Sequence, residues 1–180
     1  MGDGARIGPF NVFRDVRSLR LGASATISQW NWISAAAALV EAGAPGSFAM
    51  GKHSAVTSRH YLDVSGGVSI GEFTTVAGVR STFITHGIRW TVSEQSVKGI
   101  EIGDYCLISS NVSVTPGTVV ENKVVVGMGA TISGQLQSNS LYVQPRAALQ
   151  RTDLVGSYFS RRRGFVDPAP TRERDVRSVN

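Results

Sequence analysis

The sequence lacks the features that define several protein classes. It has one cysteine, Cys106, among 180 residues, so a disulfide framework is excluded. No apolar run approaches the roughly 18 residues that a membrane span needs, and residues 1–20 contain no apolar stretch typical of a signal peptide. The sequence therefore predicts a cytoplasmic protein without a membrane span.

Charge is also scarce. Charged residues make up 17% of the chain, and the net charge is +5. Residues 161–180 hold six arginines against three acidic residues, so this segment carries most of the positive charge. Because the acidic residues interleave with the arginines and no RNA-binding motif is present, we expect a solvated tail and no nucleic-acid partner.

Aliphatic side chains, by contrast, recur at every sixth position in the second half of the chain. The run is unbroken through Ile102, Ile108, Val114, Val120, Val126 and Ile132. A helix face repeats at 3.6 residues and a strand face at two, so neither produces this period. A chain that turns a corner after each short strand does produce it. Such coils stack into a parallel β-helix, which makes the chain all-β.

Shorter runs with the same spacing extend the pattern upstream, beginning at Ile7, Phe13 and Leu19. The residue four after each aliphatic is mostly small or apolar, and we expect it to point inward as well. These patterns predict one β-helix domain over residues 1–150. Residues 151–180 are expected to form a short helical cap, which covers the last coil, and a basic tail.

Two segments interrupt the repeats. Residues 34–47 read SAAAALVEAGAPGS, which predicts a short alanine-rich helix that ends before Gly43 and Pro45. Residues 87–99 read GIRWTVSEQSVKG and are expected to form a protruding loop. Loops on a rigid scaffold often carry function, because the scaffold fixes their bases while the tip contacts a ligand.

The chain has three histidines, at positions 53, 60 and 86. His86 ends the segment FITH and directly precedes the protruding loop, so a rigid coil holds one side of it and the other side can face a substrate. An imidazole can accept a proton near neutral pH, which makes His86 a candidate general base. His60 takes an inward-pointing place four residues after Val56, and we interpret it as a structural residue.

The segment IEIGDYCLISSNVSVTPGTVVENKVVVGMGATIS resembles the hexapeptide repeats of the acyltransferases that have a left-handed parallel β-helix fold. The preceding segment SRHYLDVSGGVSIGEFTTVAGVRSTFITHG is similar to the branch of that family that O-acetylates sugars and polysaccharides. The resemblance implies acetyl transfer from acetyl-CoA to a sugar hydroxyl, with His86 as the base and direct transfer in a ternary complex. It also implies a homotrimer whose active sites lie between subunits.

The same resemblance implies which residues bind the two substrates. The pantetheine groove maps onto coil corners at Ser110, Met128, Gly129 and Ser133. Two departures from the family pattern are Ser109, where glycine is common, and the segment QPRA at 144–147. On the acceptor side, Asp63 is a candidate to orient the substrate or His86, and Arg89 and Trp90 on the loop are candidates to contact a sugar ring.

Two other interpretations remain open. The same β-helix carries a three-histidine zinc site in one class of carbonic anhydrase, although the closest pair here, His53 and His60, is seven residues apart. A non-catalytic trimeric scaffold is the second alternative, since solenoids often serve as binding surfaces. We expect an enzyme that uses acetyl-CoA and a sugar or glycan acceptor, and that needs no metal.

Overall fold

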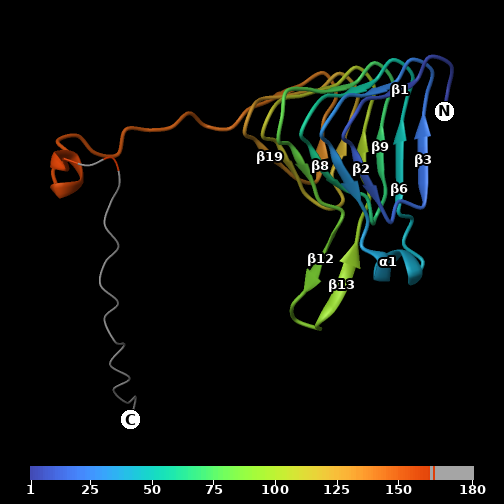
Figure 1. Cartoon of the computed structure of the whole chain (residues 1–180), viewed down its shortest axis with the longest axis horizontal. Coiled ribbons are helices and arrows are strands. Elements are labelled where there is room, and N and C mark those ends of the chain that lie inside the picture. Colours follow the sequence, from blue (N-terminus) through green and yellow to red (C-terminus); the bar gives the residue numbers. More distant parts are fainter. Residues whose placement is uncertain (163, 165–180) are drawn as a thin grey trace, which may run out of the picture. The chain divides into compact units, whose positions relative to one another are not determined.

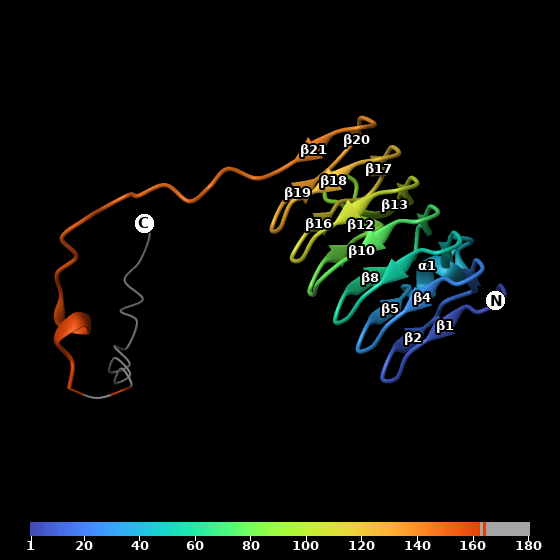
Figure 2. The same ribbon diagram turned by 90° about the horizontal axis from the view of Figure 1, so that it is seen from above.

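A computed structural model describes residues 1–162 and residue 164. The chain divides into two compact units, Met1–Pro145 and Arg146–Asn180. The first is a left-handed parallel β-helix, whose coils follow one another in chain order (Figures 1 and 2). Each complete coil contributes one short strand to each of three parallel sheets, which we name A, B and C.

Sheet A consists of β1 (Arg6–Ile7), β4 (Thr26–Ile27), β7 (Ala55–Val56), β10 (Thr75–Val76), β15 (Leu107–Ile108), β18 (Val125–Val126) and β21 (Leu141–Tyr142). Sheet B consists of β2 (Val12–Arg14), β5 (Trp32–Ser34), β8 (Tyr61–Asp63), β11 (Thr82–Phe83), β16 (Ser113–Val114) and β19 (Thr131–Ile132). Sheet C consists of β3 (Ser18–Leu21), β6 (Ser47–Met50), β9 (Val68–Ile70), β14 (Ile100–Ile102), β17 (Val119–Val120) and β20 (Gln135–Leu136).

The sixfold spacing places one aliphatic side chain in the interior at each strand. All six members of the run from Ile102 to Ile132 are at most 5% exposed. The small or apolar residues four positions later are buried as well: Cys106, Val112, Thr118, Val124, Ala130 and Leu136. The predicted interior is therefore confirmed for this half. At the first coil, Ile7 and Phe13 are 39% and 37% exposed, because no preceding coil covers them.

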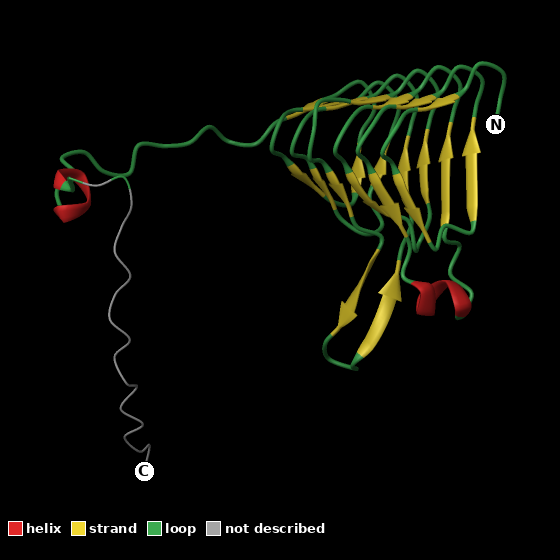
Figure 3. Cartoon of the chain, viewed as in Figure 1, coloured by secondary structure: helices red, strands yellow, loops and turns green. Residues whose placement is uncertain are grey.

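Three corners join the sheets, and we name them A–B, B–C and C–A after the sheets they connect. The A–B and C–A corners are short turns in every coil. The B–C corner holds both insertions, which project from the same edge of the solenoid (Figures 1 and 3). They are α1 (Ala37–Glu41), which confirms the predicted helix, and an antiparallel hairpin of β12 (His86–Arg89) and β13 (Glu94–Val97).

The segment predicted as a loop at 87–99 is thus a hairpin. In the second unit, the described residues contain one 3₁₀ helix, Ser157–Ser160, with no buried side chain. Its role as a cap for the last coil stays a prediction, and the arginine-rich part of the expected tail lies mostly outside the described residues. No helix among the residues that the structure describes is long and apolar enough to cross a membrane.

Candidate active site

His86 begins the hairpin at the B–C corner and lies against the preceding coil. Sheet B pairs β11 with β8, so Phe83 lies beside Leu62 and the residues that follow each strand are also neighbours. This register brings Asp63 and His86 together, although they are 23 residues apart in the sequence. The Nδ1 atom of His86 lies 2.8 Å from Oδ2 of Asp63.

Asp63 is 3% exposed, and other donors fix its carboxylate. Oδ2 accepts hydrogen bonds from the backbone N–H and the hydroxyl of Thr85, both at 2.7 Å, and from the backbone N–H of His86 at 3.1 Å. Oδ1 accepts from the hydroxyl of Ser65 at 2.6 Å and from its backbone N–H at 3.1 Å. Donors of the protein itself therefore contact both oxygens of Asp63.

These contacts set the charge of Asp63. Burial alone raises the pKa of the carboxyl, but the hydrogen bonds from Ser65 and Thr85 favour the carboxylate, and the net pKa lies below its ordinary value. Asp63 is the predicted candidate to orient either the substrate or His86, and its contacts favour the second of these roles. It is buried and contacts the imidazole through Nδ1.

The ionised Asp63 determines where the imidazole carries its proton. A carboxylate only accepts hydrogen bonds, so Nδ1 of His86 must be the donor. In the neutral ring, Nε2 then has a free lone pair, and it has no hydrogen-bond partner within residues 1–162 and 164. The side chain of His86 is 35% exposed. The pair has the geometry of a general base with its orienting carboxylate.

Ser65 and Thr85 are site residues that the sequence interpretation missed. Both are fully buried polar side chains at the B–C corner. Ser65 also accepts a hydrogen bond from the backbone N–H of Ala36, at 2.8 Å, and so connects the Asp63 carboxylate to the segment that leads into α1. The signal that could have revealed them is a cluster of small polar residues, DVS and TH, on two adjacent coils.

The two loop candidates lie on the hairpin. Arg89 pairs with Glu94 directly across the strands, and both side chains are 59% exposed. Trp90 follows at the tip and is 85% exposed. The guanidinium of Arg89 is therefore already engaged in holding the hairpin, whereas the Trp90 ring is available to a ligand or to another chain.

The four residues expected to bind CoA lie at two different corners. Ser110, Met128 and Gly129 belong to the A–B corner, and the N–H of Gly129 donates to the carbonyl of Ser110 at 3.0 Å. A side chain at Gly129 would collide with the amide of Gln144. Ser133, in contrast, follows β19 and belongs to the B–C corner, where His86 lies. Sheet B separates the two sets within one chain.

The other two histidines lie apart from this pair. His60 is 1% exposed; its Nδ1 accepts a hydrogen bond from the N–H of Ser81 at 3.1 Å, and its Nε2 lies 3.0 Å from the hydroxyl of Thr57. Burial lowers its pKa to about 4, so the ring is neutral, as expected for a structural histidine. His53 stacks on Phe73 at the C–A corner, with ring centroids 5.0 Å apart. The described residues contain no cluster of three potential metal ligands.

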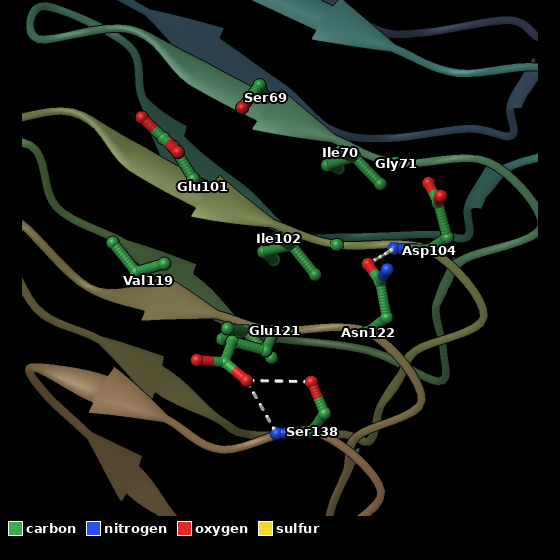
Figure 4. A pocket seen from close by; sticks show the side chains of 12 residues that line it. Ser69, Ile70, Gly71, Glu101, Ile102, Asp104, Val119, Glu121, Asn122 and Ser138 are labelled. Carbon is green, nitrogen blue, oxygen red and sulfur yellow. Dashed lines mark hydrogen bonds between the residues drawn. The ribbon is translucent and has the colours of Figure 1, made fainter.

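A shallow depression of about 410 Å³ lies on sheet C and the adjoining C–A corner (Figure 4). Its lining includes Glu101, Asp104 and Glu121 but none of the predicted site residues. The carboxylate of Glu121 accepts hydrogen bonds from the hydroxyl of Ser138 at 2.7 Å and from its backbone N–H at 2.9 Å, and these bonds lower its pKa. The depression is separate from His86.

Neither a family model nor a curated protein matches the sequence. Solved structures do match. A point mutant of AntD, an N-acyltransferase from Bacillus cereus in complex with dTDP-4-amino-4,6-dideoxyglucose and coenzyme A, aligns with a TM-score of 0.67 at 15% identity, over 79% of this chain and 77% of that chain. The fold is that of the hexapeptide-repeat acyltransferases.

Two further hexapeptide-repeat acyltransferase structures align with TM-scores of 0.52 at 14% identity. A maltose O-acetyltransferase from Clostridium difficile 630 matches over 73% of this chain and 65% of its own. A hexapeptide-repeat-containing acetyltransferase from Vibrio cholerae O1 biovar eltor, complexed with acetyl coenzyme A, matches over 79% of this chain and 67% of its own. These structures support the predicted fold, which the parallel sheets show directly.

Proposed function

We propose that this protein transfers an acetyl group from acetyl-CoA to a hydroxyl of a sugar or polysaccharide precursor. The observation that carries the proposal is the pair formed by His86 and the buried, ionised Asp63, which leaves Nε2 of His86 as an accessible base. The acyltransferases with the same fold, two of them in complex with coenzyme A or acetyl coenzyme A, support it. A scaffold has no need of a buried carboxylate beneath a rim histidine.

The proposed reaction proceeds in two steps. Nε2 of His86 removes the proton of the sugar hydroxyl as the oxygen attacks the thioester carbonyl, and a tetrahedral oxyanion forms. Backbone N–H groups at the coil corners stabilise the oxyanion. The intermediate then collapses, the C–S bond breaks, and the CoA thiolate takes the proton from the imidazolium. Asp63 stays ionised throughout and stabilises the positive charge on the ring.

Transfer is direct, without an acyl-enzyme. Cys106 is 3% exposed and its Sγ lies 3.0 Å from the carbonyl of Glu121 in the interior, so its thiol cannot reach a substrate. Burial also raises the pKa of this thiol, which disfavours the nucleophilic thiolate. Both substrates must therefore be bound together when the acyl group moves.

We further propose a homotrimer in which neighbouring chains complete each site. Within one chain, sheet B separates His86 from the A–B corner where Ser110, Met128 and Gly129 lie. The proposed trimer has sheet B facing a threefold axis parallel to the solenoid, which places the B–C corner of one chain against the A–B corner of the next. The base of one chain then faces the CoA groove of its neighbour, and exposed hairpin residues such as Ile88 and Trp90, which are 74% and 85% exposed, contact that neighbour.

Three measurements test this proposal. Calorimetry should show CoA binding, release of free thiol from acetyl-CoA should depend on an added sugar or sugar nucleotide, and sedimentation velocity should give a trimer. A protein that binds no CoA at millimolar concentration is not an acyltransferase of this type. A monomer that is nevertheless active would refute the shared site.

A further inference from the structure

A continuous column of side chains runs along the A–B corner. The same turn position in successive coils is occupied by Phe10, Trp30, Arg59, Arg80 and Asn111, all with φ between 57° and 63°, and then by Gly129 at 75°. Backbone hydrogen bonds connect the turns, for example from the N–H of Arg80 to the carbonyl of Arg59 at 3.0 Å. The side chains of this column therefore stand one above another.

The residue types in the column conflict with its backbone. A left-handed conformation favours glycine and asparagine, which occupy the last two places. The first four places carry large aromatic or cationic side chains instead. The C–A corner carries large residues at the equivalent turn position as well, namely Phe73, Tyr105 and Lys123 with φ between 54° and 59°. The charge of the A–B corner, rather than its turn conformation, therefore sets this column apart.

The column has an aromatic end and a cationic middle. The rings of Phe10 and Trp30 are stacked with centroids 4.4 Å apart, and they are 66% and 51% exposed. Arg59 and Arg80 follow on the next two coils, both exposed. Neither guanidinium has an ion-pair or hydrogen-bond partner among residues 1–162 and 164.

Two unpaired arginines on adjacent coils repel each other, so they do not stabilise the fold by themselves. The six turns of the A–B corner, at 8–11, 28–31, 57–60, 77–81, 109–112 and 127–130, contain no aspartate or glutamate. The C–A corner differs, because there Lys52 pairs with Glu72 at 3.0 Å. The A–B corner is thus an uncompensated cationic edge beside a stacked aromatic pair.

We propose that this column binds the nucleoside diphosphate part of a nucleotide-linked sugar, which is the acceptor of the transferred acyl group. The nucleobase stacks on Trp30, and the two phosphates bridge Arg59 and Arg80. Strand spacing puts adjacent coils about 4.8 Å apart, which suits two successive phosphates. This inference rests on the proposed acyltransferase function.

The order of the column also agrees with the reaction. The coil after Arg80 carries Ser110 and Asn111, and the next one carries Met128 and Gly129, where CoA is expected. A sugar attached to the second phosphate would therefore lie beside the acyl donor. Arg80 and His86 belong to the same coil, so a threefold axis parallel to the solenoid places His86 of a neighbouring chain at the same height.

CoA also contains a nucleoside diphosphate, so donor and acceptor must be distinguished. The test uses the full chain and calorimetry with CoA and with the diphosphates of uridine, thymidine, guanosine and cytidine as probes. The Arg59→Asn/Arg80→Asn double variant should weaken binding of the preferred diphosphate at least tenfold and leave CoA affinity within twofold. Its melting temperature should not fall, because asparagine suits the backbone at both places.

Lys123→Asn is the matched control, because Lys123 is a cation at the corresponding position of the C–A corner with φ 59°. This substitution should change neither the affinity for CoA nor the affinity for the preferred diphosphate. A wild-type protein that binds CoA but none of the four diphosphates refutes this inference and leaves the acyltransferase proposal standing. Loss of CoA affinity in the double variant also refutes it, since the column would then hold the donor. A protein that binds neither kind of probe contradicts both proposals.

Discussion

Asp63→Asn is the substitution that most sharply separates orientation of His86 from simple support of the fold. Asparagine has one carbonyl oxygen in place of the two carboxylate oxygens, which accept hydrogen bonds from Ser65, Thr85 and His86. The carbonyl is expected at the Oδ2 position, because three backbone and side-chain donors of Thr85 and His86 meet there in addition to Nδ1. The amide nitrogen then faces the N–H of Ser65, which loses its acceptor at a cost of about 1–3 kcal/mol.

The larger effect is on catalysis. His86 keeps its proton on Nδ1, but the imidazolium that forms in the transition state loses its negatively charged partner. For two charges about 4 Å apart near a protein surface, that interaction is worth about 4 kcal/mol. Each 1.36 kcal/mol corresponds to a factor of about ten, so kcat should fall about a thousandfold. KM for acetyl-CoA should change little, because Asp63 lies beneath His86 and away from the A–B corner.

Kinetics are followed by thiol release, and folding by circular dichroism during heating. Ser65→Ala is the control, since it removes a donor to the other carboxylate oxygen and leaves the bond between Oδ2 and Nδ1 in place. It should lower the melting temperature by a similar amount while kcat drops less than tenfold. If Asp63→Asn and Ser65→Ala reduce kcat equally, the carboxylate acts on the fold alone and the reasoning is wrong.

Three further predictions concern His60, the A–B corner and the assembly. Burial lowers the pKa of His60 from 6.5 to about 4, so the unfolded chain takes up a proton first as the pH falls. The stability contributed by the neutral ring is full above pH 6.5 and decreases by roughly 3 kcal/mol by pH 4. Urea unfolding midpoints should show this decrease, and His60→Gln should remove it. Met128→Trp should raise KM for acetyl-CoA at least tenfold with an unchanged melting temperature, since Met128 is 64% exposed at the A–B corner. At acetyl-CoA concentrations far below this raised KM, trimers reassembled from a mixture of that variant and His86→Asn should reach about a quarter of wild-type activity. Mixtures no more active than Met128→Trp alone would contradict the shared site.

The sixfold period was sufficient to predict the solenoid and its interior, because the aliphatic residues of such a repeat are all buried only when successive coils stack on one another. Two details were not predictable in the same way. Ile7 and Phe13 follow the pattern but lie at an open end, where the repeat has no neighbour to bury them. The segment at 87–99 was predicted as a loop, although Ile88, Trp90 and Val92 alternate with polar residues as in a strand. Arg89 and Glu94 pair across it in the hairpin.

The site shows a further limit of a sixfold pattern. A sixfold pattern treats every corner alike, whereas a complete coil has three different corners. Ser110 and Met128 are 18 residues apart and share a corner, but Ser133 falls at the next one. Asp63 and His86 are 23 residues apart, and only the register of β8 with β11 brings them together. Counting in steps of 18, with the insertions removed, would have separated the two sets.

Turnover of the His86→Asn variant tests the central claim most directly. Asparagine retains a polar side chain at the rim but cannot act as a base, and the fold should persist because the histidine is 35% exposed. Thiol release from acetyl-CoA with an active acceptor should fall at least about a hundredfold, while calorimetry gives the same affinity for CoA as the wild-type protein. Turnover close to that of the wild type would contradict the assignment of His86 as the catalytic base.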